Sequence, residues 1–523
     1  MRVSPLTLKL QDPRCLRGPF LALAYKNLYN GYLESLLLEL LLKGDFNHMD
    51  PISVHRPTIA RQDALTQAAP IREELIGAYA GKRFMLRTYG CQMNEHDTEI
   101  MAGLLRQMGF VETRDEEDAD LILFNTCAVR ENAENKVFGE IGRIRPLKNK
   151  NPELMIGLCG CMAQEKVVQE KVRKTYPWID IVFGTHNIHR LPELVDTAKA
   201  SQETVMEVWD KAEFLVDDLP KIRQDGVRAW VNIQYGCNKF CTYCIVPYTR
   251  GRERSRELRS VVEEVKALAQ QGYKEVTLLG QNVNDYGIDL GDHDFADLLR
   301  AVAKVDGVDR VRFTTSNPWN FTDRLIAAIA ESNKVCDHIH LPVQSGSNQV
   351  LTKMNRGYTR DYYLQLVEKI RRAVPNVALT TDLIVGFPTE TEQDFLDTLD
   401  LVKFVQYDTA YTFIYSPRAG TPAARLDDPV PDDEKKDRLQ RLMNVQEIIS
   451  RAYNDALVGY TLPVLIEGPS RRNEAVLSGR TSTNKVVLIE GPTEWIGQII
   501  PVQIEAAHTW TLYGRVSQER AVI

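Results

Sequence analysis

Three of the chain's nine cysteines, Cys237, Cys241 and Cys244, fall within eight residues and directly follow the strand-like run WVNIQYG. Thiolates are preferred ligands of Zn²⁺ and of iron–sulfur clusters, and this CxxxCxxC spacing supplies three where a tetrahedral zinc ion or a four-iron cluster takes four. An iron with no protein ligand can bind a small molecule and take part in chemistry. A zinc knuckle without its fourth ligand, or a redox pair beside a third cysteine, also fits the spacing. The position on a loop that leaves a buried strand favours a cofactor site.

Residues 226–455 alternate between strand-like and helix-like segments, which predicts a (β/α)6 arrangement, a partial TIM barrel. Function then belongs at the carboxyl ends of the strands. Glycine, amide and hydroxyl groups gather there and can hydrogen-bond a polar ligand, although each segment taken singly also fits an ordinary turn. The segments are Gly280–Asn284, Pro342–Asn348 and Gly386–Glu390, with Gln281, Asn282, Gln344 and Ser345 as the donors and acceptors. His338 and His340 share one face of a strand, and no side chain is assigned a catalytic role.

Residues 82–200 show a similar alternation, in which the apolar runs FMLRTYG, LILFNTC, MIGLCG and DIVFGTHN are separated by helix-like segments. This pattern predicts a doubly wound parallel sheet with helices on both faces, whose ligands bind at the carboxyl ends of the strands. Cys91, Cys127 and the pair Cys159/Cys161 lie at such ends, so we expect three thiols to converge. Coincidence is the alternative, since free cysteine is among the most buried residue types. The residues alone do not choose between Cys159 and Cys161.

Residues 458–522 change to short alternating strands with turns and no helix to cover a sheet, which favours closure into a small β-barrel. Small barrels of this kind often present basic and aromatic side chains to nucleic acid. A structural accessory domain is the alternative. The basic candidates for nucleic-acid contacts are Arg471, Arg472, Arg480 and Lys485.

A basic run follows the cysteine loop, and its residues Arg250 and Arg252 are candidates for phosphate contacts that hold a nucleic acid at the site. Glutamates interrupt the run, so a solvated face with local ion pairs is the ordinary interpretation. The place beside the cysteine loop, together with the resemblance described below, favours nucleic-acid binding for part of the run.

Length and composition exclude several classes of protein. A chain of 523 residues, 44% hydrophobic and 26% charged, has room for about three globular domains. Its formal net charge of −7 argues against non-specific nucleic-acid binding by the whole surface. An odd, clustered set of nine cysteines indicates a reducing compartment with metal or cluster ligation. No stretch reaches the roughly 18 apolar residues of a membrane span, so we expect a cytoplasmic protein without membrane contact.

Two segments carry no motif. Residues 1–80 are expected to form a poorly ordered extension, and an overlong start with Met49 as the true initiator is a hypothesis for part of it. Residues 201–225 are expected to form a linker between the first two domains.

The cysteine loop resembles that of the radical S-adenosylmethionine (SAM) enzymes. The segments GCQMN, NTCAVRENAE and GCMAQ resemble the three cysteine motifs of the radical SAM methylthiotransferases, and IVPYTRGRERSR is similar to the tRNA-modifying members. GPSRRN, GRTSTNK and the terminal LYGR resemble a TRAM domain, an RNA-binding module. These motifs cover residues 82–520 in the family order, so the chain is identified as a member of that family.

The resemblance implies two [4Fe–4S] clusters. It implies that one is held by the cysteine loop with SAM on its fourth iron, and that the turn at Gly280 and Gln281 receives the SAM amino group. It implies that the second is held by Cys91, Cys127 and Cys161, which leaves Cys159 as a spare cysteine.

The resemblance also implies a reaction. The motifs are most similar to members that insert a methylthio group at C2 of N6-isopentenyladenosine 37 in tRNA. Members that act on threonylcarbamoyl-adenosine in tRNA or on ribosomal protein S12 are alternatives, as is an RNA-binding module with structural or redox-sensing clusters. The expected partners are isopentenylated tRNA and an electron donor protein, and the expected state is a monomer.

Overall fold

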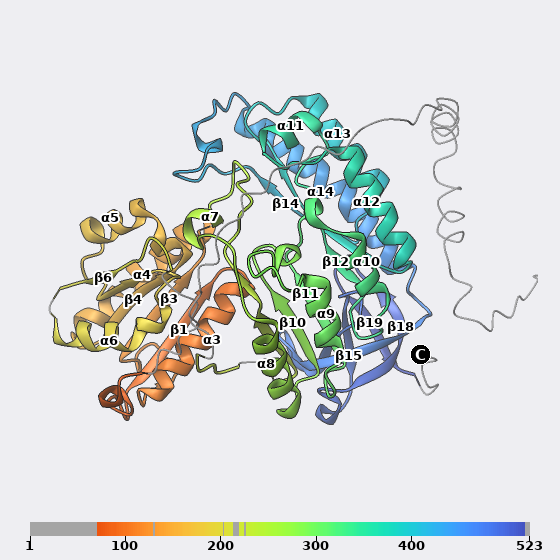
Figure 1. Cartoon of the computed structure of the whole chain (residues 1–523). Helices are drawn as coiled ribbons and strands as arrows, with labels where there is room; N and C mark the ends of the chain where they lie inside the picture. Colours follow the sequence, from red (N-terminus) through yellow and green to blue (C-terminus); the bar gives the residue numbers. More distant parts are fainter. Residues whose placement is uncertain (1–70, 129–130, 202, 213–218, 224–225, 518–523) are drawn as a thin grey trace, which may run out of the picture. The chain divides into compact units, whose positions relative to one another are not determined.

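The computed structural model describes residues 71–128, 131–201, 203–212, 219–223 and 226–517, without the side chains of residues 131–133. The expected extension up to residue 70, the start hypothesis at Met49 and much of the expected linker lie outside the described residues. The described chain belongs to one compact unit and begins with a 3₁₀ turn at Glu73–Leu75. It then forms an α/β domain, a parallel barrel and a closed β-barrel in that order (Figure 1).

The first sheet contains six parallel strands, whose bounds are β1 Arg83–Tyr89, β2 Val111–Glu112, β3 Leu121–Thr126, β4 Met155–Gly160, β5 Ile181–Phe183 and β6 Val205–Glu207. They lie in the order β2-β1-β3-β4-β5-β6, so the four predicted runs form the centre and two short unpredicted strands form the edges. Since β2 and β3 flank β1, the direction of winding reverses between β1 and β3. A doubly wound sheet opens its ligand crevice at that point, beyond the carboxyl ends of the strands.

Helices cover both faces of this sheet because its central strand β3 is apolar on both sides. The helices are α3 Gln92–Gln107, α4 Glu131–Lys150, α5 Lys166–Thr175 and α6 Leu191–Ala200, with 3₁₀ turns at Cys161–Gln164 and Ile188–Arg190. Leu121 and Leu123 of β3 pack with α3 and α6, whereas Ile122 and Phe124 pack with α4 and α5. Successive side chains of a strand point to opposite faces, so one run of four apolar residues serves two cores. The predicted doubly wound domain is confirmed.

The central domain contains six parallel strands, β7 Arg228–Asn232, β10 Glu275–Leu279, β11 Arg310–Thr314, β12 His338–His340, β13 Ala378–Val385 and β14 Thr409–Ile414. They form the sheets β7-β10-β11 and β12-β13-β14, which a parallel bridge between Val311 and Val335 connects. A helix follows each strand: α8 Leu258–Gln270, α9 Phe295–Ala303, α10 Asp323–Ala330, α12 Arg360–Ala373, α13 Glu392–Val405 and α14 Asp432–Asp455. The predicted (β/α)6 barrel is confirmed. None of the helices within the described ranges is both long and apolar enough to cross a membrane.

The barrel strands use their two faces differently. Val231, Leu278 and Leu383 pack in one large core with residues of the surrounding helices. The intervening side chains, such as those of Asn232 and Asp382, therefore face the inside of the barrel. Shorter elements join the strands to the helices: β8 Gln234–Tyr235, α7 Val246–Thr249, β9 Arg254–Ser255 and α11 Asn348–Lys353, and the 3₁₀ turns Val283–Asp285, Pro318–Asn320 and Ala423–Arg425.

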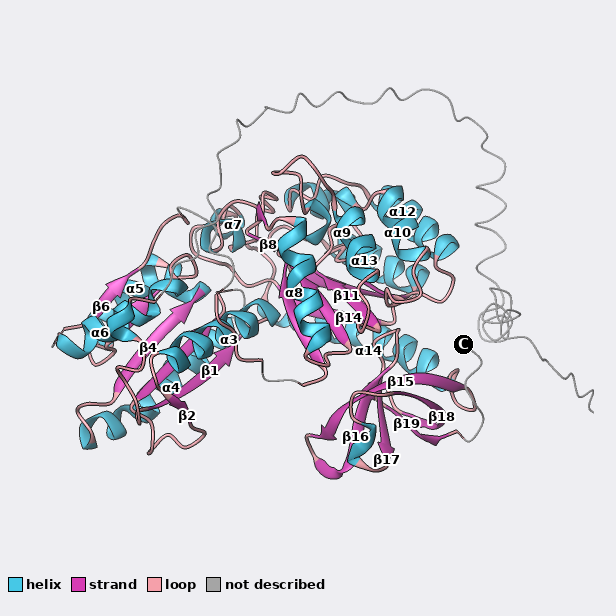
Figure 2. Cartoon of the chain, turned by 60° about the horizontal axis from the view of Figure 1, so that its bottom comes forward, coloured by secondary structure: helices cyan, strands magenta, loops and turns pink. Residues whose placement is uncertain are grey.

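The last five strands close into a barrel in the order β15-β16-β17-β19-β18 (Figure 2). Their bounds are β15 Thr461–Ser470, β16 Asn473–Arg480, β17 Val486–Glu490, β18 Ile499–Ala507 and β19 Leu512–Val516, with a 3₁₀ turn at Thr493–Trp495. Alternate residues such as Val464 and Ile466 fill the inside, as predicted from the period-two pattern. Arg310 and Arg312 of β11 donate hydrogen bonds to backbone carbonyls of this barrel, so it docks against the amino ends of the central strands.

Candidate functional site

The cysteine loop after β7 is held by hydrogen bonds on both sides. Cys237 and Cys241 are buried and Cys244 is half-buried. The Lys239 amide donates to Cys237 Sγ over 3.4 Å, and Arg356 Nη1 donates to Cys241 Sγ over 3.4 Å. Donors of this kind stabilise a thiolate, which is the form that binds metal.

Burial raises the pKa of the Cys244 thiol to about 12, so metal binding at this loop must release protons. Within the described ranges, no three His, Cys, Asp or Glu side chains are grouped as ligands of a single metal ion. A four-iron cluster places each thiolate on a different iron, so its ligands do not need to converge on one point.

The structure brings together the three cysteines predicted in the first domain. Cys91 caps the amino end of α3 directly after β1, Cys127 follows β3, and Cys161 begins the 3₁₀ turn after β4. These strands are neighbours, and the charges of Cys127 and Cys91 both act on Cys161. Burial, the largest cause, raises the pKa of the Cys161 thiol to about 12. The three thiols therefore share the crevice at the winding reversal, as expected.

Gly160 separates the environments of Cys159 and Cys161. Its φ of 90° ends β4, and a Cβ there would lie 2.4 Å from Asn125 Oδ1, so only glycine fits this turn. Cys159 stays in the core, where its Sγ lies 3.6 Å from Met101 Sδ. Cys161 instead turns toward the cysteine loop and packs with Ile245.

Arg250 occupies a position that the sequence did not predict. Its side chain is only 3% exposed, its Nε donates to Cys161 Sγ over 3.1 Å, and its Nη2 donates to Asp97 Oδ2 over 2.6 Å. The predicted phosphate contact would require this buried pair to open, which is costly because it leaves Asp97 without its partner. Arg252, two residues later, is exposed as a phosphate ligand requires.

Buried amides line the inside of the barrel beside the predicted SAM turn. Asn232, Gln234 and Asn282 have side-chain nitrogen and oxygen atoms that are buried without a hydrogen-bond partner among the described residues. A Cβ on Gly280 would lie 3.4 Å from Gln234 Oε1, so these groups adjoin the Gly280–Gln281 turn. Buried polar groups are almost always satisfied, which indicates that a polar ligand completes this site. The amino, carboxylate and hydroxyl groups of SAM fit such a set of donors and acceptors.

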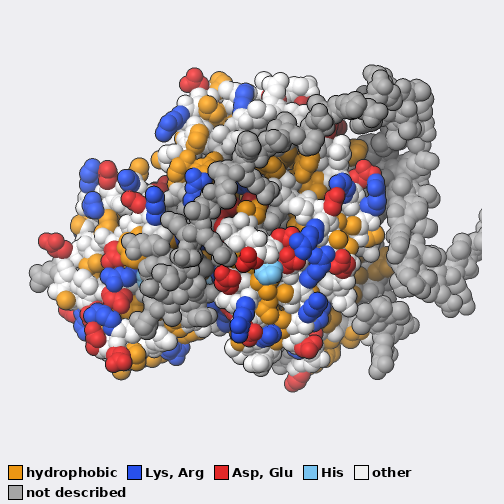
Figure 3. Space-filling view, viewed as in Figure 1, with side chains coloured by type: hydrophobic (Ala, Val, Ile, Leu, Met, Phe, Trp, Pro, Cys, Tyr) orange, Lys and Arg blue, Asp and Glu red, His pale blue; other side chains and the backbone are white. Residues whose placement is uncertain are grey.

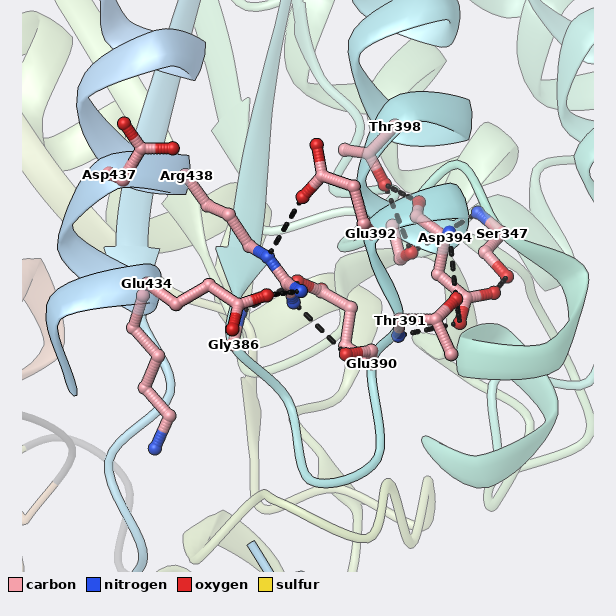
Figure 4. Close-up of polar contacts among 12 residues, drawn as sticks. Ser347, Gly386, Glu390, Thr391, Glu392, Asp394, Thr398, Glu434, Asp437 and Arg438 are labelled. Atoms are coloured by element: carbon pink, nitrogen blue, oxygen red, sulfur yellow. Dashed lines mark hydrogen bonds and ion pairs between the residues drawn. The ribbon is translucent and has the colours of Figure 1, made fainter. Parts of the chain in front are cut away.

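The polar groups of the loops after β12 and β13 make internal contacts, either within their own loop or with helices α13 and α14 (Figure 4). The Ser345 hydroxyl lies 3.2 Å from Thr398 Oγ1, and Ser347 donates to Asp394. Glu390 accepts from the Gly386 amide over 3.0 Å and from Arg438 Nη1 over 2.8 Å, in a buried ion pair that ties α14 to the end of β13. These residues therefore shape the rim of the barrel through internal contacts, and Ser345 has less capacity for a ligand than the sequence suggested.

The basic candidates of the terminal barrel fall into two groups. Arg471 and Arg472 are exposed at the turn between β15 and β16. Arg480 pairs with Glu467 over 3.1 Å, and Lys485 Nζ contacts Asp408 of the central domain. Lys485 therefore serves the joint between the terminal barrel and the central domain, whereas the ion pair of Arg480 stays within the terminal barrel. On the face drawn in Figure 3, basic and acidic side chains are interspersed, so nucleic-acid recognition depends on local groups.

Comparison with known proteins identifies the family. The Radical SAM superfamily model matches residues 231–402, the uncharacterized protein family UPF0004 matches residues 83–184, and the TRAM domain matches residues 455–517. A tRNA-2-methylthio-N(6)-dimethylallyladenosine synthase of Geobacillus thermodenitrificans is 54% identical over 451 residues, 86% of this chain and 86% of that protein. The chain belongs to this synthase family. The synthase of Oceanobacillus iheyensis is 56% identical over 436 residues, 83% of this chain and 84% of that protein.

Membership confirms the predicted radical SAM, TRAM and enzyme assignments, and with them the dependence on SAM and iron–sulfur clusters. A solved structure, the radical S-adenosylmethionine methyltransferase TsrM from Kitasatospora setae, aligns with 66% of this chain and 74% of that chain, with a TM-score of 0.49 and 14% identity. The family assignment depends on the sequence matches.

Proposed function

We propose that this chain inserts a methylthio group at C2 of N6-isopentenyladenosine 37 in tRNA. The observation that carries the proposal is the 54% identity to a synthase named for that product, over 451 residues that make up 86% of this chain and 86% of that protein. We assign one four-iron cluster to Cys237, Cys241 and Cys244, and a second to Cys91, Cys127 and Cys161. The two sets lie on loops that Arg250 connects.

C2 of adenosine carries no acidic proton, so a side-chain base cannot activate it. When bound, SAM and the clusters supply the radical and sulfur chemistry that the residues themselves lack. The chain's own part is to position these groups. The unpartnered amides of Asn232, Gln234 and Asn282 are placed to orient SAM beside Gly280 and Gln281. Arg250 and Asp97 hold the Cys161 side of the crevice against the cysteine loop.

RNA contacts are assigned to exposed basic residues beside the site and on the terminal barrel. Arg252, Arg471 and Arg472 are exposed, whereas Arg250, Arg480 and Lys485 would first have to leave their present partners. RNA-modifying enzymes favour single-stranded loops, whose unstacked bases can be turned outward, and the anticodon loop meets that requirement. We further propose that the protein is a cytoplasmic monomer that receives electrons from a donor protein. Its proposed domains are residues 82–200, 226–455 and 458–522.

The decisive test uses anaerobically reconstituted protein with SAM, reductant and isopentenylated tRNA, followed by mass spectrometry of the nucleosides. The 2-methylthio derivative of N6-isopentenyladenosine is expected. Parallel reactions contain tRNA with threonylcarbamoyl-adenosine, or ribosomal protein S12, and a Cys237→Ala variant is the control that should form no product. Modification of either alternative substrate alone would refute the proposal, as would RNA binding without SAM cleavage.

A further inference from the structure

Strands β13 and β14 of the central barrel present a largely apolar surface that has no role in the function proposed above. Tyr411 and Phe413 of β14 are 51% and 39% exposed, although they are aromatic and lie within a barrel strand. Their register partners on β13 are Asp382 and Ile384, so the four side chains share one face. We define these four residues as the lumen wall.

The lumen wall faces the inside of the barrel. Leu383, between Asp382 and Ile384, and Ala410, just before Tyr411, belong to the core shared with the helices, and they are buried. Because side chains alternate along a strand, Asp382, Ile384, Tyr411 and Phe413 point to the opposite side. His340 of β12 joins the same face, since its ring is 5.8 Å from that of Tyr411 and its Nε2 is 3.5 Å from Asp382 Oδ2.

The apolar end of the wall lies next to the cysteine loop. Ile384 packs against the buried cluster that contains Met354 and Phe387, and Tyr243, between Cys241 and Cys244, packs against the same cluster. Phe413 is the direct register partner of Ile384. A base seated at the cysteine loop therefore has a half-exposed aromatic and aliphatic surface within reach of its substituents.

We propose that the lumen wall recognises the N6 substituent of the target adenosine, with Phe413, Tyr411 and Ile384 contacting the isopentenyl chain and Asp382 repelling an acidic substituent. This inference rests on the proposed function and specifies how its substrate is chosen. An isopentenyl group is a branched hydrocarbon that gains from burial against aromatic and aliphatic side chains. A threonylcarbamoyl group carries a carboxylate, which the Asp382 carboxylate disfavours at close range.

The test measures binding in the absence of reductant, so it does not depend on turnover. Anticodon stem-loops with isopentenyl-adenosine, unmodified adenosine or threonylcarbamoyl-adenosine are titrated with the reconstituted enzyme and SAM. Wild type should prefer the isopentenylated loop, and Phe413→Ala should reduce that preference about tenfold without changing affinity for the unmodified loop. Phe413→Leu, which keeps an apolar side chain, should retain most of the preference. Asp382→Asn should strengthen binding of the threonylcarbamoyl loop alone.

Phe404→Ala is the matched control. Phe404 is 66% exposed and lies near the carboxyl end of α13, which runs back toward the amino ends of the strands and thus away from the cysteine loop. This variant should keep the wild-type preference. An unchanged preference in Phe413→Ala, or the absence of any preference in wild type, overturns the inference. If wild type shows the preference but forms no methylthio product, the proposed function fails while the assignment of the wall stands.

Discussion

The guanidinium of Arg250 hydrogen-bonds the thiol of Cys161, with 3.1 Å between Nε and Sγ. Arg250 belongs to the segment just after one cysteine set, and Cys161 belongs to the other set. A single buried side chain therefore connects the two proposed cluster sites, and Asp97 balances its charge. This contact gives Arg250 a positioning and electrostatic role toward the cluster of the first domain.

Removal of that guanidinium should make the first-domain cluster harder to reduce. The reduced cluster carries one more negative charge than the oxidised cluster, and a cationic donor to a ligand sulfur stabilises that charge. In Arg250→Ala, we expect a more negative midpoint potential for this cluster in an electron paramagnetic resonance redox titration. We also expect a loss of about 3–5 kcal/mol in stability, because Asp97 stays buried without its partner.

Arg252→Ala is the control for this measurement, since Arg252 is the exposed neighbour in the same segment. Its cluster potentials should equal those of wild type, and Arg250→Lys should fall between wild type and Arg250→Ala. A positive shift in Arg250→Ala would contradict the assigned role.

Single cysteine changes should halve the iron content. The reconstituted wild type should hold about eight irons per chain, and Cys91→Ala or Cys237→Ala should each hold about four. Iron and sulfide analysis after desalting measures this directly. Cys159→Ala should keep about eight, because Cys159 lies in the core against Met101 and not in the crevice. A loss of iron in Cys159→Ala equal to that in Cys91→Ala would mean that the ligand set is wrong.

Arg252→Ala should weaken tRNA binding through a phosphate contact. Arg252 has no hydrogen bond or acidic partner within the part of the chain that the structure describes, and its guanidinium lies 4.7 Å from the Phe240 ring centroid. The slope of log affinity against log salt concentration is negative, and loss of one phosphate contact should make it less negative by about one. Fluorescence anisotropy across a salt series measures the slope. Arg372→Ala, which removes a side chain 76% exposed on α12, should leave it unchanged, and an equal effect of both changes would exclude a specific contact.

Glu165→Gln should alter the pH dependence of stability. Burial, together with the nearby charge of Glu134, raises the pKa of Glu165 from 4.5 to about 7. Between these values the folded state binds more protons than the unfolded state, so the free energy of unfolding falls as pH rises through this window. Glutamine does not titrate, so the variant should not show this fall. The free energy of unfolding of the variant, relative to that of wild type, should therefore rise as pH increases from 4.5 to 7. Thermal unfolding of both proteins at several pH values tests this, and parallel curves would disprove the shift.

Local patterns in the sequence were sufficient for the fold classes and for the cysteine motifs. Strand β3 shows why: the apolar run at Leu121–Phe124 predicts a strand buried on both faces, and the structure packs helices on each of them. The expected convergence of Cys91, Cys127 and the pair Cys159/Cys161 followed from another local rule, because parallel strands end at one edge. The choice of Cys161 over Cys159 came from the family resemblance. The edge strands β2 and β6 were not predicted, because strands of two or three residues are too short to show a hydrophobic periodicity.

The sequence by itself therefore determined the longer strands and helices and which strand ends carry thiols, since periodicity and spacing along the chain decide both. Only the tertiary structure decided the partners of charged and polar side chains. Arg250 faces Cys161, Lys485 contacts Asp408, and Arg252 stays exposed, although all three are basic residues beside turns. For the same reason, the sequence could not show that the buried amides of Asn232 and Gln234 have no hydrogen-bond partner among the described residues. The energy of a charge or amide depends on burial and on partners that are distant in sequence, which no local pattern specifies.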